Sequence, residues 1–156
     1  MKVCYEPIGI IHSEFKEKAN VPIQPAFSNS KGYIELKKEY AKGLKDLDGF
    51  SHISLIYHFH KSDGFDLNVR PFLDNNQRGV FATRAPKRPN NIGLSIVKLD
   101  LIKNNVIYVS NLDILDGSPL LDIKPYVPEF TDNEKIRIGW LRGKIKMDHK
   151  SDGRFS

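Results

Sequence analysis

The sequence predicts a mostly β protein, a small antiparallel β-barrel with one short helix. Several short runs are rich in β-branched and aromatic residues and alternate in polarity, and only one stretch has helical spacing. Nine prolines and eleven glycines are distributed along the chain as turn residues. The 156 residues fit one domain, which we expect over residues 1–147 with a flexible tail at 148–156.

Seven runs are predicted to be strands. They are Tyr5–His12, Gly32–Leu36, His52–Phe59, Val80–Thr83, Ile92–Leu101, Val106–Leu112 and Ile136–Met147. Lys103–Asn105 is predicted to be a hairpin turn, because asparagine tolerates positive φ. Glu39–Leu47 is predicted to be the helix, since its apolar residues fall near one face. Many short strands with one helix favour a closed or nearly closed antiparallel barrel.

The charge is unevenly distributed along the chain. The formal net charge is +5, yet residues 77–90 contain four cations and no acid, and residues 135–156 contain seven cations against two acids. Segregated positive charge fits a polyanionic partner such as nucleic acid, although a solvated basic face is the alternative. The single cysteine suits a reducing compartment, and neither an apolar N-terminal segment nor a membrane-length apolar run is present. We therefore expect a cytoplasmic protein.

Three segments between predicted strands are rich in proline, glycine and polar residues: Asn20–Phe27, Gly79–Ser95 and Leu112–Pro128. In the first segment, two prolines fix φ, so that a stiff loop presents Gln24; a rigid connector is the alternative. In the second, cations on a proline-stiffened loop are pre-organised to meet a carboxylate or phosphate. There Gly93 allows close approach of a ligand to the backbone, whereas the alternative is an exposed basic loop that binds nothing.

The third segment mixes aspartates with apolar residues, as small-molecule pockets do. Asp116-Gly117 within it is a strong turn signal. The alternative is a plain turn followed by a short strand, with Asp122 and Lys124 on its solvent face.

Several kinds of chemistry lack sequence support. His58 and His60 share one face of a predicted strand, but without Cys-x-x-Cys or His-Glu-x-x-His a zinc site is incomplete, and no metal is expected. The sequence has no Walker A motif, no Gly-x-Gly-x-x-Gly and no Gly-x-Ser-x-Gly.

Two long motifs resemble a known family. Gly79–Ser95 (GVFATRAPKRPNNIGLS) looks like the signature of the TrmO-type tRNA methyltransferases, and Asp113–Pro128 (DILDGSPLLDIKPYVP) is similar to their second signature. Val21–Pro25 also matches, and the resemblance extends over about residues 8–126. It implies a homodimeric, S-adenosylmethionine-dependent β-barrel enzyme that methylates N6 of N6-threonylcarbamoyladenosine, the base 3′ of the tRNA anticodon. Because the chain ends at Ser156, we expect the compact form without the C-terminal domain of many bacterial members.

The resemblance also implies a set of cofactor contacts. They are Gln24, Pro25, Ala26, His60, Lys61, Arg84, Leu94, Asp113, Ile114, Leu115, Asp116 and Gly117. Ala26 and Lys61 depart from the usual glycine and glutamine at these places. Arg84 is expected to bind the cofactor carboxylate, with the adenine between Leu94 and Leu115.

Methyl transfer to a carbamoylated nitrogen needs a proton acceptor or a deprotonated ground state, because the nitrogen lone pair is delocalised. The candidate residues are Asp116, His58 and Tyr126, in that order. The threonine carboxylate of the substrate requires a cation, for which Lys124, Arg88 and Lys87 are candidates. For Lys124, a structural ion pair is equally consistent with the sequence.

Two other function classes remain open at this point. One is a non-catalytic RNA-binding barrel, since small basic β-barrels bind nucleic acid without chemistry. The other is a methyltransferase of the same fold that acts on a different RNA or on a small molecule.

Overall fold

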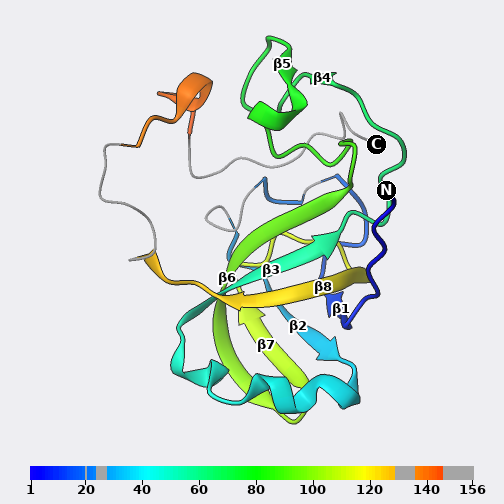
Figure 1. Cartoon of the computed structure of the whole chain (residues 1–156). Helices are drawn as coiled ribbons and strands as arrows, with labels where there is room; N and C mark the ends of the chain where they lie inside the picture. Colours follow the sequence, from blue (N-terminus) through cyan, green and yellow to red (C-terminus); the bar gives the residue numbers. More distant parts are fainter. Residues whose placement is uncertain (20, 24–27, 129–135, 146–156) are drawn as a thin grey trace.

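The structure is a computed structural model that describes residues 1–19, 21–23, 28–128 and 136–145. Six strands form a closed antiparallel barrel in the order β1-β2-β7-β6-β3-β8 (Figure 1). Their bounds are β1 Gly9–His12, β2 Lys31–Leu36, β3 His52–His58, β6 Ile92–Lys103, β7 Val106–Ser110 and β8 Ser118–Pro125. The barrel closes because β8 pairs with both β1 and β3.

The barrel interior is filled by aliphatic side chains from alternate strand positions. On β3, Ile53 and Leu55 are fully buried while their sequence neighbours are half-buried, as expected when one face of a strand points into a core. The remaining members of this core include Ile11, Ile34, Val97, Ile107, Val109, Leu112, Ile114 and Leu120. Full closure leaves no unpaired edge on these six strands.

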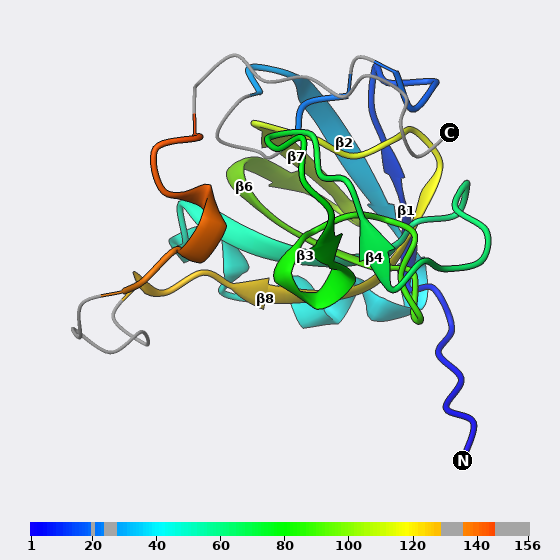
Figure 2. The same cartoon turned by 90° about the horizontal axis from the view of Figure 1, so that it is seen from above.

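The two ends of the barrel are covered differently. At one end lie the 3-10 helices η2 (Lys38–Leu44) and η3 (Leu47–Gly49), drawn in cyan in Figure 1. At the other end lies a green segment with β4 (Asn68–Val69), β5 (Arg78–Gly79) and the 3-10 helix η4 (Val80–Ala82), which Figure 2 shows from above. A further 3-10 helix, η6 (Gly139–Leu141), follows the barrel.

The predicted mostly β barrel is confirmed, and so are the strands at 32–36, 52–59, 92–101 and 106–112, within a few residues at their ends. The predicted Lys103–Asn105 turn joins β6 and β7, and Asn104 has the expected positive φ of 55°. The predicted helix is present as η2 and ends early, since Lys45 is extended and Asp46 has φ 66°. Among the described ranges, no helix is long and apolar enough to cross a membrane.

Three strand predictions need correction. Residues 5–8 precede β1 and are not a strand, although the backbone N–H of Ile8 donates to the Leu120 carbonyl. The run Val80–Thr83 contains the 3-10 helix η4 and not a strand. In Ile136–Met147, residues 139–141 form η6, and the part beyond residue 145 lies outside the described residues, as does the expected tail at 148–156. This segment cannot add a seventh strand to the barrel, because β8 already pairs with the free edges of both β1 and β3.

Candidate active site

A cavity of about 300 Å³ opens at the barrel end that the β4–β5 segment covers. This volume lies at the lower end of the range of small-molecule sites. Its walls come from four segments that are far apart in the sequence, together with Phe72. The lining residues of these segments fall within 18–23, 57–62, 83–94 and 113–118. The three loops singled out by composition therefore each contribute to one cavity, together with the end of β3.

Asp113 is the buried carboxyl group in this cavity. It is 9% exposed, and its Oδ1 atom has no hydrogen-bond partner among the described residues. Burial raises the pKa of Asp113 to about 7, against the smaller opposing effects of the Ser95 hydroxyl and the Arg84 guanidinium. A buried polar atom without a partner is unfavourable, so this oxygen is suited to receive an N–H or O–H group from a ligand.

Two buried hydroxyl residues, Tyr57 and Ser95, are neighbours of Asp113, and of these two Tyr57 lines the cavity. The Tyr57 hydroxyl lies 3.3 Å from the Ser95 hydroxyl, and both residues are buried. Burial raises the pKa of the Tyr57 phenol, so the phenol stays neutral. The Ser95 hydroxyl also hydrogen-bonds to the Asp113 carboxyl, so it links the Tyr57 phenol to this carboxyl and orients it.

Gly93 explains why the Tyr57 ring can lie there. The two residues are direct partners in the β3–β6 register, and a Cβ on Gly93 would lie 2.3 Å from Cζ of Tyr57. A shift in the β3–β8 register falls between Ile56 and Tyr57, which is where a β-bulge re-aims a side chain. Glycine is therefore required for close packing rather than for a special φ.

The basic loop of residues 83–91 is held rigid by side chains that bind its own backbone. Arg88 donates to the carbonyls of Thr83 and Ala85, each at 3.1 Å. Asn91 donates to the Pro86 carbonyl at 2.8 Å. These bonds fix the loop without neutralising its charge, so its cations are pre-organised for an anionic ligand.

Arg84 lies at the point where this loop returns to β6. Its guanidinium donates to the Leu94 carbonyl, and both residues line the cavity while remaining exposed. The guanidinium has five donor hydrogens, so this single bond leaves others for a ligand carboxylate.

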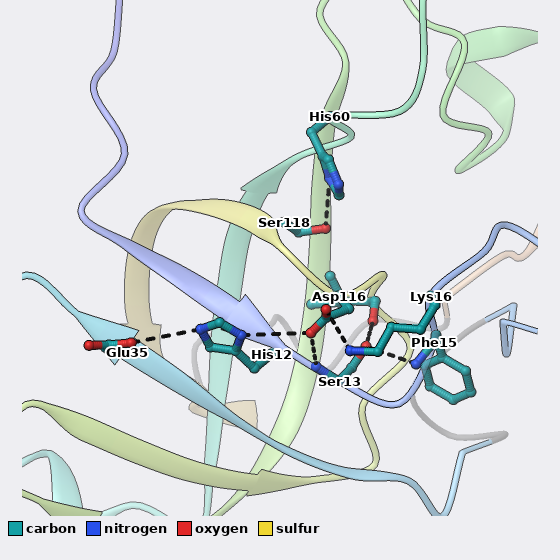
Figure 3. Close-up of polar contacts among 9 residues, drawn as sticks. His12, Ser13, Phe15, Lys16, Glu35, His60, Asp116 and Ser118 are labelled. Atoms are coloured by element: carbon teal, nitrogen blue, oxygen red, sulfur yellow. Dashed lines mark hydrogen bonds and ion pairs between the residues drawn. The ribbon is translucent and has the colours of Figure 1, made fainter.

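Asp116 adjoins the cavity but belongs to a separate ion cluster, which Figure 3 shows. Its carboxylate accepts the backbone N–H of Ser13 at 2.9 Å and the Lys16 ammonium at 2.6 Å, and His12 lies 3.7 Å away. The Lys16 hydrogen bond, opposed by partial desolvation and helped by Ser13 and His12, lowers the pKa of Asp116. An aspartate held ionised in this way is a weak proton acceptor.

His60 and Lys61 form the rim at the end of β3. The His60 Nδ1 atom lies 3.2 Å from the Ser118 hydroxyl (Figure 3), and the Lys61 ammonium donates to the Lys16 carbonyl at 2.7 Å. Burial, then the neighbouring Lys61 and His58, lower the pKa of His60, with Asp116 opposing. The His60 imidazole is therefore neutral at neutral pH.

The structure brings together most of the predicted cofactor contacts. Those that line the cavity are His60, Lys61, Arg84, Leu94, Asp113, Ile114 and Leu115, and Arg88 joins them. Asp116 and Gly117 lie next to this wall in the turn before β8, where Gly117 has φ 79°. Gln24, Pro25 and Ala26 lie outside the described residues.

Four other predicted residues do not line the cavity. His58 is exposed at the end of β3, and Lys87 lines a separate polar groove. Lys124 forms an ion pair with Asp122 at 2.8 Å, which matches the structural alternative drawn from the sequence. In the β3–β8 register, Lys124 lies opposite Ser54 near the start of β3, and the backbone N–H of Tyr126 donates to the His52 carbonyl. Lys124 and Tyr126 therefore lie at the opposite end of β3 from His60.

Sequence reasoning missed Tyr57 and Ser95, because buried aromatic and hydroxyl residues on predicted strands look like ordinary core. The available signal was Gly93, a glycine inside a strand pattern, which indicates close approach of a neighbouring group. Among the described residues, no group of three or more His, Cys, Asp or Glu side chains is arranged to hold a metal ion.

Comparison with known proteins agrees with this geometry. The family model of the tRNA-methyltransferase O N-terminal domain matches residues 10–132. The chain belongs to this family. The matched range includes every described segment that lines the cavity.

Individual relatives and a solved structure support the assignment of the chain to this family. A probable S-adenosyl-L-methionine-binding protein of Pyrococcus abyssi is 52% identical over 99% of this chain and 86% of its own length. The mouse tRNA (adenine(37)-N6)-methyltransferase is 33% identical over 95% of this chain, which spans only 36% of that enzyme. The crystal structure of TrmO from Pseudomonas aeruginosa superimposes with a TM-score of 0.75 and 37% identity, covering 90% of this chain and 63% of that one.

Proposed function

We propose that the protein is an S-adenosylmethionine-dependent methyltransferase that modifies N6 of an adenine in tRNA. The finer proposal is that the acceptor is N6-threonylcarbamoyladenosine beside the anticodon. The observation behind it is the cavity itself, which is walled by apolar and cationic residues and lined by the buried carboxyl residue Asp113. Membership in the tRNA-methyltransferase O family supports the assignment.

The residues present fit the cofactor. S-adenosylmethionine has a carboxylate, hydrogen-bond donors on its ribose and ammonium groups, and an apolar-faced adenine. Arg84 is the group suited to the carboxylate, Asp113 to a hydroxyl or ammonium donor, and Leu94 and Leu115 to the faces of the adenine. When bound, S-adenosylmethionine supplies a methyl group already activated on a positively charged sulfur.

The protein's share of the chemistry is positioning and the handling of one proton. Rigid cavity walls hold donor and acceptor in line, which is a major part of the rate enhancement for an activated donor. Of the cavity residues, His60 is best suited to take up the acceptor proton, because its lowered pKa keeps the imidazole neutral near pH 7. His60 thereby takes the place of Asp116 as the preferred proton acceptor.

The proposed partners follow from charge and from the family. The cationic segment around residues 77–90 lies beside the cavity, which suits contact with tRNA phosphates. A homodimer and a cytoplasmic location are part of the same proposal, on the resemblance of the chain to its family.

The test is methylation in vitro, followed by mass spectrometry of the tRNA nucleosides. Purified protein, S-adenosylmethionine and tRNA with N6-threonylcarbamoyladenosine should yield the N6-methylated nucleoside, whereas His60→Ala should lower kcat with little change in KM for tRNA. The same tRNA with plain adenosine at that position tests the finer proposal. Binding of both ligands without any methylated product would leave the non-catalytic RNA-binding class instead.

A further inference from the structure

A second cavity, of about 370 Å³, adjoins the first one. The two cavities share a wall made chiefly of Thr83, Arg84 and Pro86, with Phe72 and Ile23 contributing to both. Its other lining is apolar, and it comes from residues 71–82, Ala85 and residues 140–145. Within the part of the chain that the structure describes, no predicted cofactor contact other than Arg84 lines this second cavity.

Phe81 and Trp140 are the aromatic residues that distinguish the second cavity. Phe81 lies on the 3-10 helix η4 and is 75% exposed, so its ring is accessible to a ligand in this cavity. The Trp140 indole N–H donates to the Ala82 carbonyl at 2.8 Å, so Trp140 is attached to the residue that follows Phe81, and both aromatic residues line the same cavity.

Two cations lie close to the Trp140 ring. Arg78 and Lys144 lie 5.5 Å and 5.9 Å from the centre of its ring, a distance at which cations are attracted to an aromatic face. Both cations also form ion pairs with the buried Asp74, at 2.6 Å and 2.7 Å. The residues 140–145 are thereby attached to the loop that contains Phe81, and the cavity between them has a defined shape.

The chemistry of this cavity selects its ligand. An exposed aromatic ring next to a cation can bind an unpaired nucleobase, because the ring stacks on the base while the cation attracts the adjoining phosphate. Among the described residues that line this cavity, Arg84 is the cation, and Lys87 and Arg88 follow it on the same basic loop. A ligand placed here would lie against the shared wall at Arg84, next to the space assigned above to the methyl donor.

We propose that the second cavity is the acceptor subsite, which takes an unpaired adenine of RNA stacked on Phe81 and against Trp140. This inference rests on the proposed function, since it names the place where the acceptor of that reaction binds. Phe81 is then a positioning residue for the acceptor base, with no part in binding the methyl donor.

The single tryptophan of the chain gives a direct test that needs no catalysis. The probe is an RNA hairpin with an unpaired adenosine in its loop, and its control is the same hairpin with that nucleotide abasic. Tryptophan emission is followed during titration with each RNA, and anisotropy of the labelled hairpin gives an independent dissociation constant. We expect the adenosine hairpin to change the emission saturably and to bind more tightly than the abasic one.

Two variants test whether RNA binds in the second cavity. Phe81→Ala should weaken binding of the adenosine hairpin by about 5- to 150-fold, the range measured for loss of one base-stacking side chain. Because Phe81 is mostly exposed, the variant should fold normally. Phe50→Ala, which removes another exposed aromatic near the start of β3, is the matched control and should leave binding unchanged.

Equal affinity for the adenosine and abasic hairpins, or unaltered binding by Phe81→Ala, would overturn the inference. So would emission that changes with protein concentration and not with RNA, because a second copy of the chain would then cover the cavity. Calorimetry with S-adenosylmethionine separates this result from the proposed function. If the wild-type protein does not bind S-adenosylmethionine, the proposed function is contradicted. If Phe81→Ala binds S-adenosylmethionine as the wild type does but binds RNA more weakly, the acceptor subsite is supported.

Discussion

Replacement of Asp113 by asparagine should change how stability depends on pH. In the folded protein, burial raises the pKa of this carboxyl from the ordinary 3.8 to about 7. Between these two values the unfolded chain loses its proton while the folded chain keeps it. Stability therefore falls as pH rises through this window, and the cost is complete once pH exceeds the folded value.

The magnitude follows from the size of the shift. A difference of about 3 units corresponds to about 4 kcal/mol in total, at 1.36 kcal/mol for each unit. Part of this cost is already present at pH 5, so between pH 5 and pH 8 the linkage relation leaves about 2 to 3 kcal/mol. The asparagine side chain that replaces Asp113 in the variant cannot titrate, so the variant lacks this contribution at every pH.

Urea unfolding of wild type and Asp113→Asn at pH 5 and pH 8 measures the effect. We subtract the free energy of unfolding of the variant from that of the wild type at each pH. This difference should be more negative at pH 8 than at pH 5 by about 2 to 3 kcal/mol. A packing difference that is the same at both pH values cancels in the comparison. Asp74→Asn is the matched control. Hydrogen bonds from Lys144 and Arg78, against desolvation, lower the pKa of Asp74 in the folded protein, so its contribution to stability is lost only as pH falls below the ordinary carboxyl range. The wild-type minus Asp74→Asn difference should therefore be the same at pH 5 and pH 8. A wild-type minus Asp113→Asn difference that does not change with pH would refute the account of this carboxyl.

Two further predictions concern the contact between Gly93 and Tyr57 and the basic loop. Gly93→Ala should destabilise the protein by about 1–3 kcal/mol in urea unfolding, because the new methyl group would lie 2.3 Å from the Tyr57 ring. Gly43→Ala, whose methyl group would meet nothing within 4 Å, should not destabilise it, and equal loss in both variants would argue against the packing explanation. Lys87→Ala should reduce the slope of log affinity for tRNA against log salt by about one unit; an unchanged slope would remove Lys87 from the phosphate contacts.

The barrel could be predicted because its strands follow simple local rules. In β3 and β6, alternating polarity with β-branched residues reflects one face turned to the core, and that pattern is visible in the sequence. The segment Ile136–Met147 shows similar alternation, but Ile136 and Ile138 are exposed and no barrel position is left for them. Local pattern does not report whether a partner strand is available.

The strand β8 was predicted only as the alternative for its segment, a turn followed by a short strand, and that alternative is confirmed. Ser118–Pro125 contains two prolines and begins directly after the Asp116-Gly117 turn, so its composition favoured a loop. Its pairing with both β1 and β3 is a long-range property that closes the barrel.

The candidate site was predictable as a set of loops, but the role of each carboxyl group within it was not. Asp113 and Asp116 are three residues apart, and only the fold shows that one is buried without a described partner for Oδ1 while the other is bound to Lys16 and Ser13. The electrostatic effects that separate their pKa values come from burial and from residues about 100 positions away.

Titration calorimetry with S-adenosylmethionine tests the central claim most directly, namely that the cavity above Asp113 binds this cofactor. The wild-type protein should bind one molecule per chain, and Arg84→Ala should weaken binding by about tenfold or more through loss of a charge-assisted hydrogen bond. Lys98→Ala, which removes an exposed cation farther along β6, should bind like wild type. Absence of binding heat in the wild-type protein, or equal affinity in Arg84→Ala, would contradict the account.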